Sequence, residues 1–168
     1  MNAPAKTPKE VQTARQMLRH CLATIAYRGG KAVRNAPTDF DCFRVAQDAR
    51  TPAKLLVHIC DLMDWALTMS KGEAAWHDSE PTSWERDVER FHASIKKLDE
   101  YLASDLPLHS PADKLFQGPI ADALTHVGQL TMLRRLAGAP IRSENYHKAD
   151  IQTGRVGADQ AAPRREFD

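Results

Sequence analysis

Two residues of types that commonly bind metal ions, Asp122 and His126, stand four positions apart in a segment with helical periodicity, residues 118–138. In an α-helix this spacing places their Cβ atoms roughly 5–6 Å apart on one face. Together with Gln129 they fall inside an arc of the helix that is otherwise apolar. Burying a carboxylate is costly unless a partner compensates for its charge. A metal ion is one such partner, and an arginine from a neighbouring helix is the alternative.

A second imidazole stands on a different predicted helix. His58 lies at the edge of an apolar stripe within residues 52–71, on the same side as Trp65 one heptad later. His58, Asp122 and His126 would together supply two nitrogen ligands and one carboxylate from two facing helices. This donor set suits one divalent ion of zinc, nickel, iron or manganese, and it leaves coordination positions for water or a substrate. The structural alternative for each histidine is a hydrogen-bonded imidazole at the edge of the core.

Two further residues are candidates for the wall of such a site. Gln129 follows His126 by one turn and could hydrogen-bond a ligand or a substrate, and Trp65 shares its helix with the first histidine. For each of them a packing role or a bond to the backbone is the alternative. Asp61 and Asp64, on the same predicted helix as Trp65, are expected to face outward from the core.

Other catalytic chemistries have weaker support. The sequence contains no phosphate-binding loop, no glycine-rich dinucleotide fingerprint and no nucleophile elbow. Cys60 is a conceivable nucleophile, but it lies beside the core stripe and has no evident base. Five of the seven histidines stand in connectors, in the tail or beside helix seams, where we expect surface or packing roles. No residue is assigned a catalytic role from the sequence.

The elements that must position these residues are helices. The last of them is marked at both ends, since Pro119 suits the first helical position and Gly138 can adopt the left-handed closing conformation. Three earlier helices begin at capping threonines, and the first two of them end at glycines, at Gly29-Gly30 and at Gly72. The capping threonines are Thr7, Thr51 and Thr82, and the predicted helices span residues 8–28, 52–71, 82–104 and 119–138.

No segment has the pattern of a convincing strand, and there is no internal repeat. Residues 1–140 are therefore predicted to form one all-α domain, a four-helix bundle with long connecting loops. The connections after the first and third helices are long enough for crossovers, so the directions of the helices stay open. Residues 141–168 are predicted to be an irregular C-terminal tail, because they are polar with little periodicity, and Tyr146 is the residue expected to anchor them.

The composition argues against several classes of partner. Lys and Arg number 23 against 22 Asp and Glu, which gives a formal charge of +1 and no electrostatic basis for binding nucleic acid or an anionic membrane. No apolar run approaches the roughly 18 residues of a membrane span. The first ten residues contain no apolar signal core, and the three cysteines form no Cys-x-x-Cys pair. We therefore expect a cytoplasmic protein with reduced thiols.

A resemblance to a known family rests on His58 and on one stretch of the last helix. The stretch reads Asp122-x-x-x-His126-x-Gly128-Gln129-Leu130 and continues as Leu133-Arg134-Arg135-Leu136-x-Gly138. In these features, and in helix order, the chain resembles the DinB-like superfamily of bacterial metal-binding four-helix bundles. The resemblance implies one histidine ligand from the second helix, matched by His58, and two ligands one turn apart on the fourth. The first of that pair is usually histidine, and Asp122 in its place makes the set harder and negatively charged.

The superfamily includes thiol-dependent transferases and isomerases, so the resemblance implies a metal-dependent enzyme. A metal ion that polarises a substrate oxygen or lowers the pKa of a bound water or thiol fits both a transferase and a hydrolase. The enzyme's substrate would be a small molecule that the sequence does not identify. The long connectors fit an arrangement common in the superfamily, in which the second and third helices run in the same direction. The alternative function is a non-catalytic interaction or dimerisation module, with a homodimer as its simplest form. In that module Asp122 and His126 would only pair with each other or with an arginine.

Overall fold

The computed structural model describes residues 7–167, and helices make up most of it. Four helices are long: α1 (Pro8–Val33), α2 (Pro52–Lys71), α3 (Trp84–Ala103) and α5 (Ala121–Leu136). The short elements are a 3-10 turn η1 (Phe40–Cys42), α4 (Ala112–Leu115), a π-helical turn η2 (Phe116–Ile120), and the strands β1 (Ser143–Glu144) and β2 (Glu166–Phe167). The predicted all-α class is therefore confirmed.

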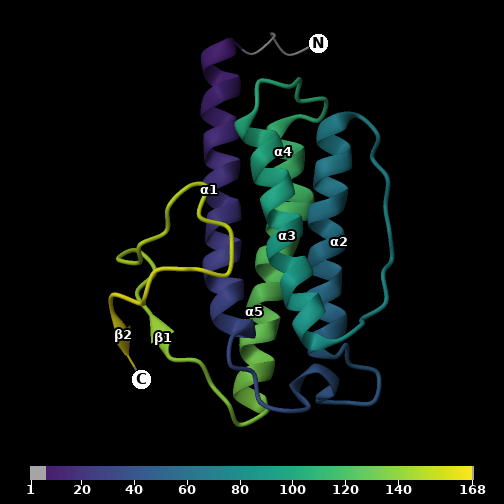
Figure 1. Ribbon diagram of the computed structural model, residues 1–168, viewed down its shortest axis with the longest axis vertical. Helices are drawn as coiled ribbons and strands as arrows, with labels where there is room; N and C mark the ends of the chain where they lie inside the picture. Colours follow the sequence, from purple (N-terminus) through teal and green to yellow (C-terminus); the bar gives the residue numbers. More distant parts are fainter. Residues whose placement is uncertain (1–6, 168) are drawn as a thin grey trace.

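The four long helices lie side by side around one core (Figure 1). α1 packs against α3 and α5, and α2 packs against the same two helices. In the view of Figure 1, α1 runs downward, α2 and α3 both run upward, and α5 runs downward again. α2 and α3 are thus parallel, and the connector between them, residues 72–83, returns along the length of the molecule. α2 and α5, which carry the predicted ligands, run antiparallel.

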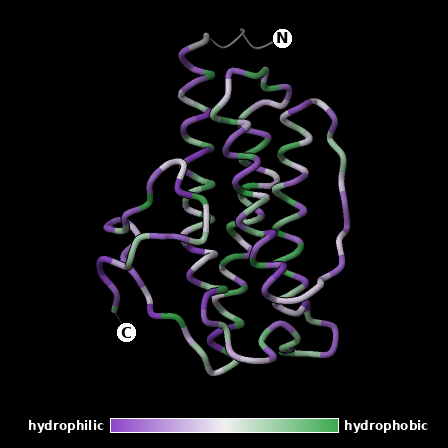
Figure 2. The backbone as a smooth tube through the Cα atoms, viewed as in Figure 1, coloured by the Kyte–Doolittle hydropathy of each residue, from purple (hydrophilic) through white to green (hydrophobic). Residues whose placement is uncertain are grey.

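The core is formed by one face of each long helix. Apolar and hydrophilic segments alternate along these helices with the helical turns (Figure 2). All four contribute fully buried side chains, among them Leu22, Leu56, Ile95 and Leu130. Within residues 7–167, none of the helices combines the length and the apolar character that crossing a bilayer requires.

The capping residues predicted for α1 and α2 set the starts of these helices. Thr7 accepts a bond from the amide of Glu10, whose carboxylate accepts from the amide of Thr7 at 2.7 Å, so the capping box is complete. Thr51 caps α2 by accepting from the amide of Lys54. Gly72 follows α2 in the left-handed conformation, with φ 90°. The predicted range 52–71 is confirmed, because both of its boundaries depend on local backbone chemistry.

The predicted end of the first helix at Gly29-Gly30 is wrong, because α1 continues to Val33. A Cβ atom on Gly29 would lie 2.5 Å from Cζ of Phe91 on α3, so this glycine lets the two helices approach closely. Phe91 is fully buried by the contact. Glycine within a helix costs about 1 kcal/mol relative to alanine, and burial of the Phe91 ring offsets that cost. Gly29 is therefore a packing residue and not a stop signal.

The last predicted helix begins before Pro119 and contains a kink. α4, η2 and α5 follow one helical path over residues 112–136, interrupted at Gly118, whose ψ of −106° is non-helical. Pro119 lacks the amide that a regular helix would use, and the path widens into a π-turn around it. The closing conformation predicted for Gly138 is confirmed by its φ of 74°, and the amide that follows bonds back to the Arg134 carbonyl at 3.0 Å.

α3 begins two residues later than predicted. Ser83, and not Thr82, is the N-cap and accepts a bond from the amide of Arg86. The hydroxyl and amide of Thr82 instead donate to the carboxylate of Asp87, at 2.8 and 3.1 Å. Asp87 is buried, so its carboxylate needs donors. Thr82 supplies these donors, and Ser83 caps the helix in its place.

The C-terminal tail lies along α1 in Figure 1 and is largely irregular, with one antiparallel pairing between β1 and β2. Glu144 is buried and accepts bonds from the Tyr27 hydroxyl at 2.8 Å and from Lys31 Nζ at 3.0 Å. Val156 joins the hydrophobic core. The ring of Tyr146 packs edge-on against Tyr27, with 6.4 Å between centroids, so the expected anchor is present. The tail thus extends the core of the helices.

Candidate metal centre

The structure brings His58, Asp122 and His126 together at the seam between α2 and α5. One donor atom from each side chain lies within 4.8 Å of the other two. Among residues 7–167 this is the one group of three or more His, Cys, Asp or Glu side chains that is close enough to share a metal ion. All three residues selected from the sequence therefore meet in one place.

The Asp122 carboxylate lies between the two imidazoles. Its Oδ2 atom is 3.7 Å from Nε2 of His58, and its Oδ1 atom is 3.4 Å from Nε2 of His126. The two rings are 4.8 Å apart between centroids and nearly perpendicular, at 85°. Both N···O distances exceed the roughly 2.7–3.2 Å of a good N–H···O hydrogen bond. The three donor atoms thus surround a gap, and within the described residues no arginine pairs with Asp122.

The positions of α2 and α5 bring these three side chains together. Asp122 and His126 project from the first two turns of α5, directly after the kink at Gly118. Their spacing of four residues places both on one face of the helix. α2 runs antiparallel to α5 and presents His58 to that face from its second turn. A change of one residue in the phase of α5 would rotate the pair by about 100° and separate it from His58.

Gln129 orients one of the imidazoles. Its Oε1 atom lies 2.9 Å from Nδ1 of His126 and accepts the proton of that nitrogen. The other ring nitrogen, Nε2, then carries the lone pair and faces Asp122. A hydrogen bond of this kind is the usual way in which a metal-ligating histidine is held in one tautomer. Gln129 therefore supports the cluster without belonging to it, as its position one turn beyond His126 suggested.

The surroundings of His58 favour its neutral form. Burial lowers the pKa of the imidazole, and the neighbouring His126 and Arg50 lower it further. The carboxylate of Asp122 acts in the opposite direction and raises the pKa. A metal ion binds only a neutral imidazole. A lowered pKa leaves more of the His58 imidazole neutral at neutral pH, so less of it has to lose a proton before an ion binds.

Two tryptophans stand beside the cluster, and only one of them was a candidate from the sequence. Trp76, in the connector between α2 and α3, packs its ring edge-on against His58 at 5.7 Å between centroids. It also contacts Trp65 on α2 at 5.7 Å. The connector has no periodicity that would predict its path. The position of Trp76 over His58 is therefore decided by the fold and carries no local sequence signal.

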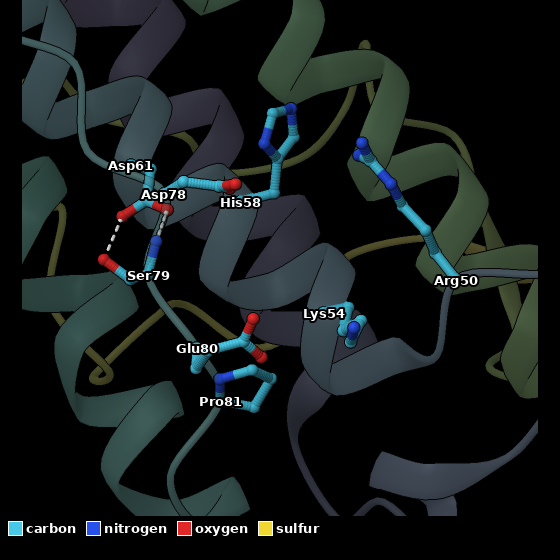
Figure 3. A pocket seen from close by; sticks show the side chains of 8 residues that line it. All are labelled: Arg50, Lys54, His58, Asp61, Asp78, Ser79, Glu80 and Pro81. Atoms are coloured by element: carbon cyan, nitrogen blue, oxygen red, sulfur yellow. Dashed lines mark hydrogen bonds between the residues drawn. The ribbon is translucent and has the colours of Figure 1, made fainter.

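The connector is held in place by Asp61, whose predicted outward orientation is wrong. The side chain of Asp61 is 1% exposed. Its carboxylate accepts from the amide and the hydroxyl of Ser79, at 2.9 and 2.8 Å (Figure 3), and from Arg90 on α3 at 2.6 Å. The helical pattern placed Asp61 at the margin of the apolar stripe, where the connector and α3 cover it. Asp64, at 27% exposure, shares Arg90 through a bond of 2.8 Å.

The cluster is open to small molecules. A polar hollow of about 190 Å³ lies beside His58, with Lys54 in its wall (Figure 3). A second hollow, of about 400 Å³, lies beside Asp122 and includes Trp65 in its wall. The Asp122 side chain is 45% exposed, whereas those of His58 and His126 are 19% and 11% exposed. An incoming ligand can therefore reach the carboxylate while the imidazoles stay shielded.

The structure does not support the alternative nucleophile. Cys60 is fully buried, and its Sγ atom donates to the carbonyl of Leu56 at 3.2 Å. Burial raises the pKa of its thiol to about 12, so the thiolate is not populated at neutral pH.

Comparison of the chain with protein-family models, with curated proteins and with solved structures gives no match.

Proposed function

We propose that this chain is a DinB-like four-helix bundle that binds one divalent metal ion through His58, Asp122 and His126. In this proposal the protein is a metal-dependent enzyme of transferase or hydrolase type that acts on a small molecule. The ion is zinc, nickel, iron or manganese, all of which accept imidazole and carboxylate ligands.

The observation that carries the proposal is the spacing of the donor atoms. Ligands that lie about 2.0–2.2 Å from a tetrahedral ion are roughly 3.3–3.6 Å from one another. The two measured N···O separations, 3.4 and 3.7 Å, are close to this range. The widest separation in the cluster, at most 4.8 Å, requires only a small inward turn of the rings. A carboxylate hydrogen-bonded to the two imidazoles would lie closer to them.

Three protein ligands with an exposed carboxylate are typical of a catalytic metal site, whereas a structural site is closed by four protein ligands. When bound, the ion would polarise a substrate oxygen or lower the pKa of a bound water or thiol. The chain's own contribution is positional. Gln129 holds His126 in one tautomer, and Trp76 covers one side of His58.

The course of the chain supports the family part of the proposal. The parallel α2 and α3, joined by a connector that returns along the molecule, match the arrangement that the resemblance implies. The ligands also come from the second and fourth long helices, as they do in that superfamily.

The test is direct metal binding by protein from which any affinity tag has been removed, because tag histidines bind the same ions. We expect one zinc or other divalent ion per chain by elemental analysis. Ion at a hundredfold excess over its Kd stabilises the folded state by about 2.7 kcal/mol. For a chain of this size that corresponds to a rise in Tm of roughly 5–10 °C. The variant His126→Ala should lose most of the rise, and Asp122→Asn should weaken it.

The matched control is His20→Ala, since His20 is an exposed histidine on α1 and lies far along the sequence from the cluster. It should bind and respond as the wild type does. Wild-type protein that carries no ion, and that melts at the same temperature with or without each of the four metals, would overturn the proposal. The interaction-module function would then take its place.

Catalysis is tested separately on the metal-loaded protein. Hydrolysis of p-nitrophenyl esters and conjugation of a low-molecular-weight thiol to an electrophile represent the two reaction types. Activity in either assay that disappears in Asp122→Asn supports an enzyme. Tight metal binding with activity in neither assay would limit the proposal to metal binding.

A further inference from the structure

A third hollow lies on the surface of α5, next to the ligand cluster, and differs from the other two in chemistry. It measures about 380 Å³ and is lined mainly by apolar side chains of α2, α5 and the loop before α2. Leu55 and Leu133 are buried and form its floor. Val45, Met132 and Leu136 form its rim and are 51–56% exposed.

The polar groups of this hollow are few and stand at the end nearest the cluster. One is Gln129, whose side chain bonds to His126. The other is Arg50, which also lines the polar hollow beside His58. Arg50 thus stands between the ligand cluster and the apolar surface. In Figure 3 its guanidinium and the His58 ring extend to the same side of α2.

The guanidinium of Arg50 is available to a ligand. Arg50 is exposed, and among residues 7–167 no carboxylate or carbonyl oxygen pairs with its side chain. Arg44, in the same loop, donates instead to the carbonyls of Gln47 and Ala49. A guanidinium forms strong paired hydrogen bonds with a carboxylate, because the two groups match in shape.

We propose that the substrate of the metal centre is a small amphipathic carboxylic acid, with its carboxylate bound by Arg50 beside His58 and its apolar chain lying along Leu55, Met132 and Leu136. This inference rests on the proposed function for the reaction, but the binding of the acid can be measured independently. The volume of the hollow, about 380 Å³, lies within the range of about 300–1,000 Å³ that is typical of small-molecule sites. Its composition also agrees, since such sites combine apolar walls with a few placed polar groups.

A second copy of the chain is the competing occupant of the apolar rim. Three half-exposed side chains cover far less than the roughly 800 Å² that each partner of a stable interface buries. A protein partner would also leave the Arg50 guanidinium beside the cluster without a defined role. The size of the patch and the charge at its end therefore favour a small acid.

The test is calorimetric titration of zinc-loaded, tag-free protein with acetate, hexanoate and decanoate, and with decyltrimethylammonium as a ligand of opposite charge. Affinity should rise by about fourfold for each methylene group that reaches the apolar wall, and the ammonium ligand should bind much more weakly. Arg50→Gln should lower the affinity for decanoate by more than about tenfold, because a charged hydrogen-bond partner is lost. Met132→Ser should flatten the dependence on chain length.

Matched controls separate these effects from general changes of the surface. Arg86→Gln removes an exposed arginine of α3, and Met17→Ser removes an exposed methionine of α1. Both should bind decanoate as the wild type does. Each variant is also titrated with zinc alone, so that a change in decanoate affinity is separated from a change in zinc affinity.

The outcomes distinguish the two proposals. Zinc binding without decanoate binding, or equal decanoate affinity in wild type and Arg50→Gln, overturns the acid site and leaves the metal centre standing. Arg50-dependent decanoate binding without zinc binding supports the acid site and overturns the metal function. A wild-type dimer in sedimentation that becomes a monomer in Leu136→Asp shows that a second copy covers the rim, which overturns the acid site.

Discussion

His58 on α2 and Asp122 on α5 face each other across the seam between the two helices, with Nε2 and Oδ2 3.7 Å apart. The separation is too long for a hydrogen bond and suits two ligands of one ion. One partner is an imidazole whose pKa is lowered by burial, and the other is a carboxylate that is 45% exposed. The pair therefore joins a shielded ligand to an accessible one.

The bond between Gln129 and His126 predicts an effect on metal affinity without an effect on folding. Gln129→Leu removes the acceptor that holds the His126 tautomer, so zinc affinity should fall by roughly ten- to hundredfold. Because Gln129 is exposed, the free energy of unfolding of the metal-free protein should change little. Zinc titration and urea denaturation measure the two quantities. Gln16→Leu, at an exposed position of α1, is the control, and a similar loss of affinity in that variant would contradict the assigned role.

Asp61 should contribute more to stability than its neighbour Asp64. Asp61→Ala leaves the donors of Ser79 and one bond of Arg90 without an acceptor, which should lower the free energy of unfolding by about 2–3 kcal/mol. Asp64→Ala removes one bond at a partly exposed position and should cost less than about 1 kcal/mol. Urea denaturation of the metal-free proteins compares the two variants. Equal losses would show that the connector does not depend on the buried carboxylate.

Adding a methyl group to two helical glycines should have opposite effects. Gly29→Ala places a Cβ atom 2.5 Å from the Phe91 ring. The resulting overpacking should cost about 1–3 kcal/mol, more than the gain in helix propensity. Gly128→Ala, on α5, meets no atom within 4 Å and should stabilise the protein by about 0.5–1 kcal/mol. Thermal and urea denaturation of both variants check the signs, and a stabilised Gly29→Ala would refute the close contact.

Stability should decline in mild acid partly through His92, whose Nδ1 atom donates to the Val156 carbonyl of the tail at 3.2 Å. Burial lowers the pKa of His92 below its ordinary value of 6.5, although the bond to Val156 acts in the opposite direction. As the pH falls below about 6.5, the unfolded chain takes up this proton before the folded chain does. The contribution of His92 to the free energy of unfolding is therefore complete above about pH 6.5. It is lost as the pH falls from there through the lower pKa of His92 in the folded state.

Urea denaturation at pH 7.5 and pH 5.0 tests this sign, and His92→Gln should show a smaller decline than the wild type. His58 has a lowered pKa as well, so the comparison is repeated in a His58→Gln background. An unchanged decline in His92→Gln would assign the acid sensitivity to other groups.

Several features of the protein follow from its sequence because they depend on neighbours along the chain. Thr51 with the proline that follows begins α2, and Gly72 ends it, through backbone bonds within a few residues. The placement of Asp122 and His126 on one face follows from helix geometry alone. Likewise, Gln129 one turn further on is within reach of the His126 ring.

Other features depend on what lies across the core. Gly29 is a helix stop by local criteria, but Phe91 of α3 makes it a point of close packing. Asp61 is buried because the connector and Arg90 cover it. Neither the connector nor α3 leaves a signal in the pattern of α2.

The cluster of His58, Asp122 and His126 depends both on neighbours along the chain and on contacts across the core. Each helix determines by its own periodicity which side chains share a face, since that depends on a rotation of about 100° per residue. The meeting of the two faces depends on the antiparallel course of α2 and α5 and on their relative position along the seam. Both are decided by side chains interlocking between helices far apart in sequence, and only the tertiary structure contains those contacts.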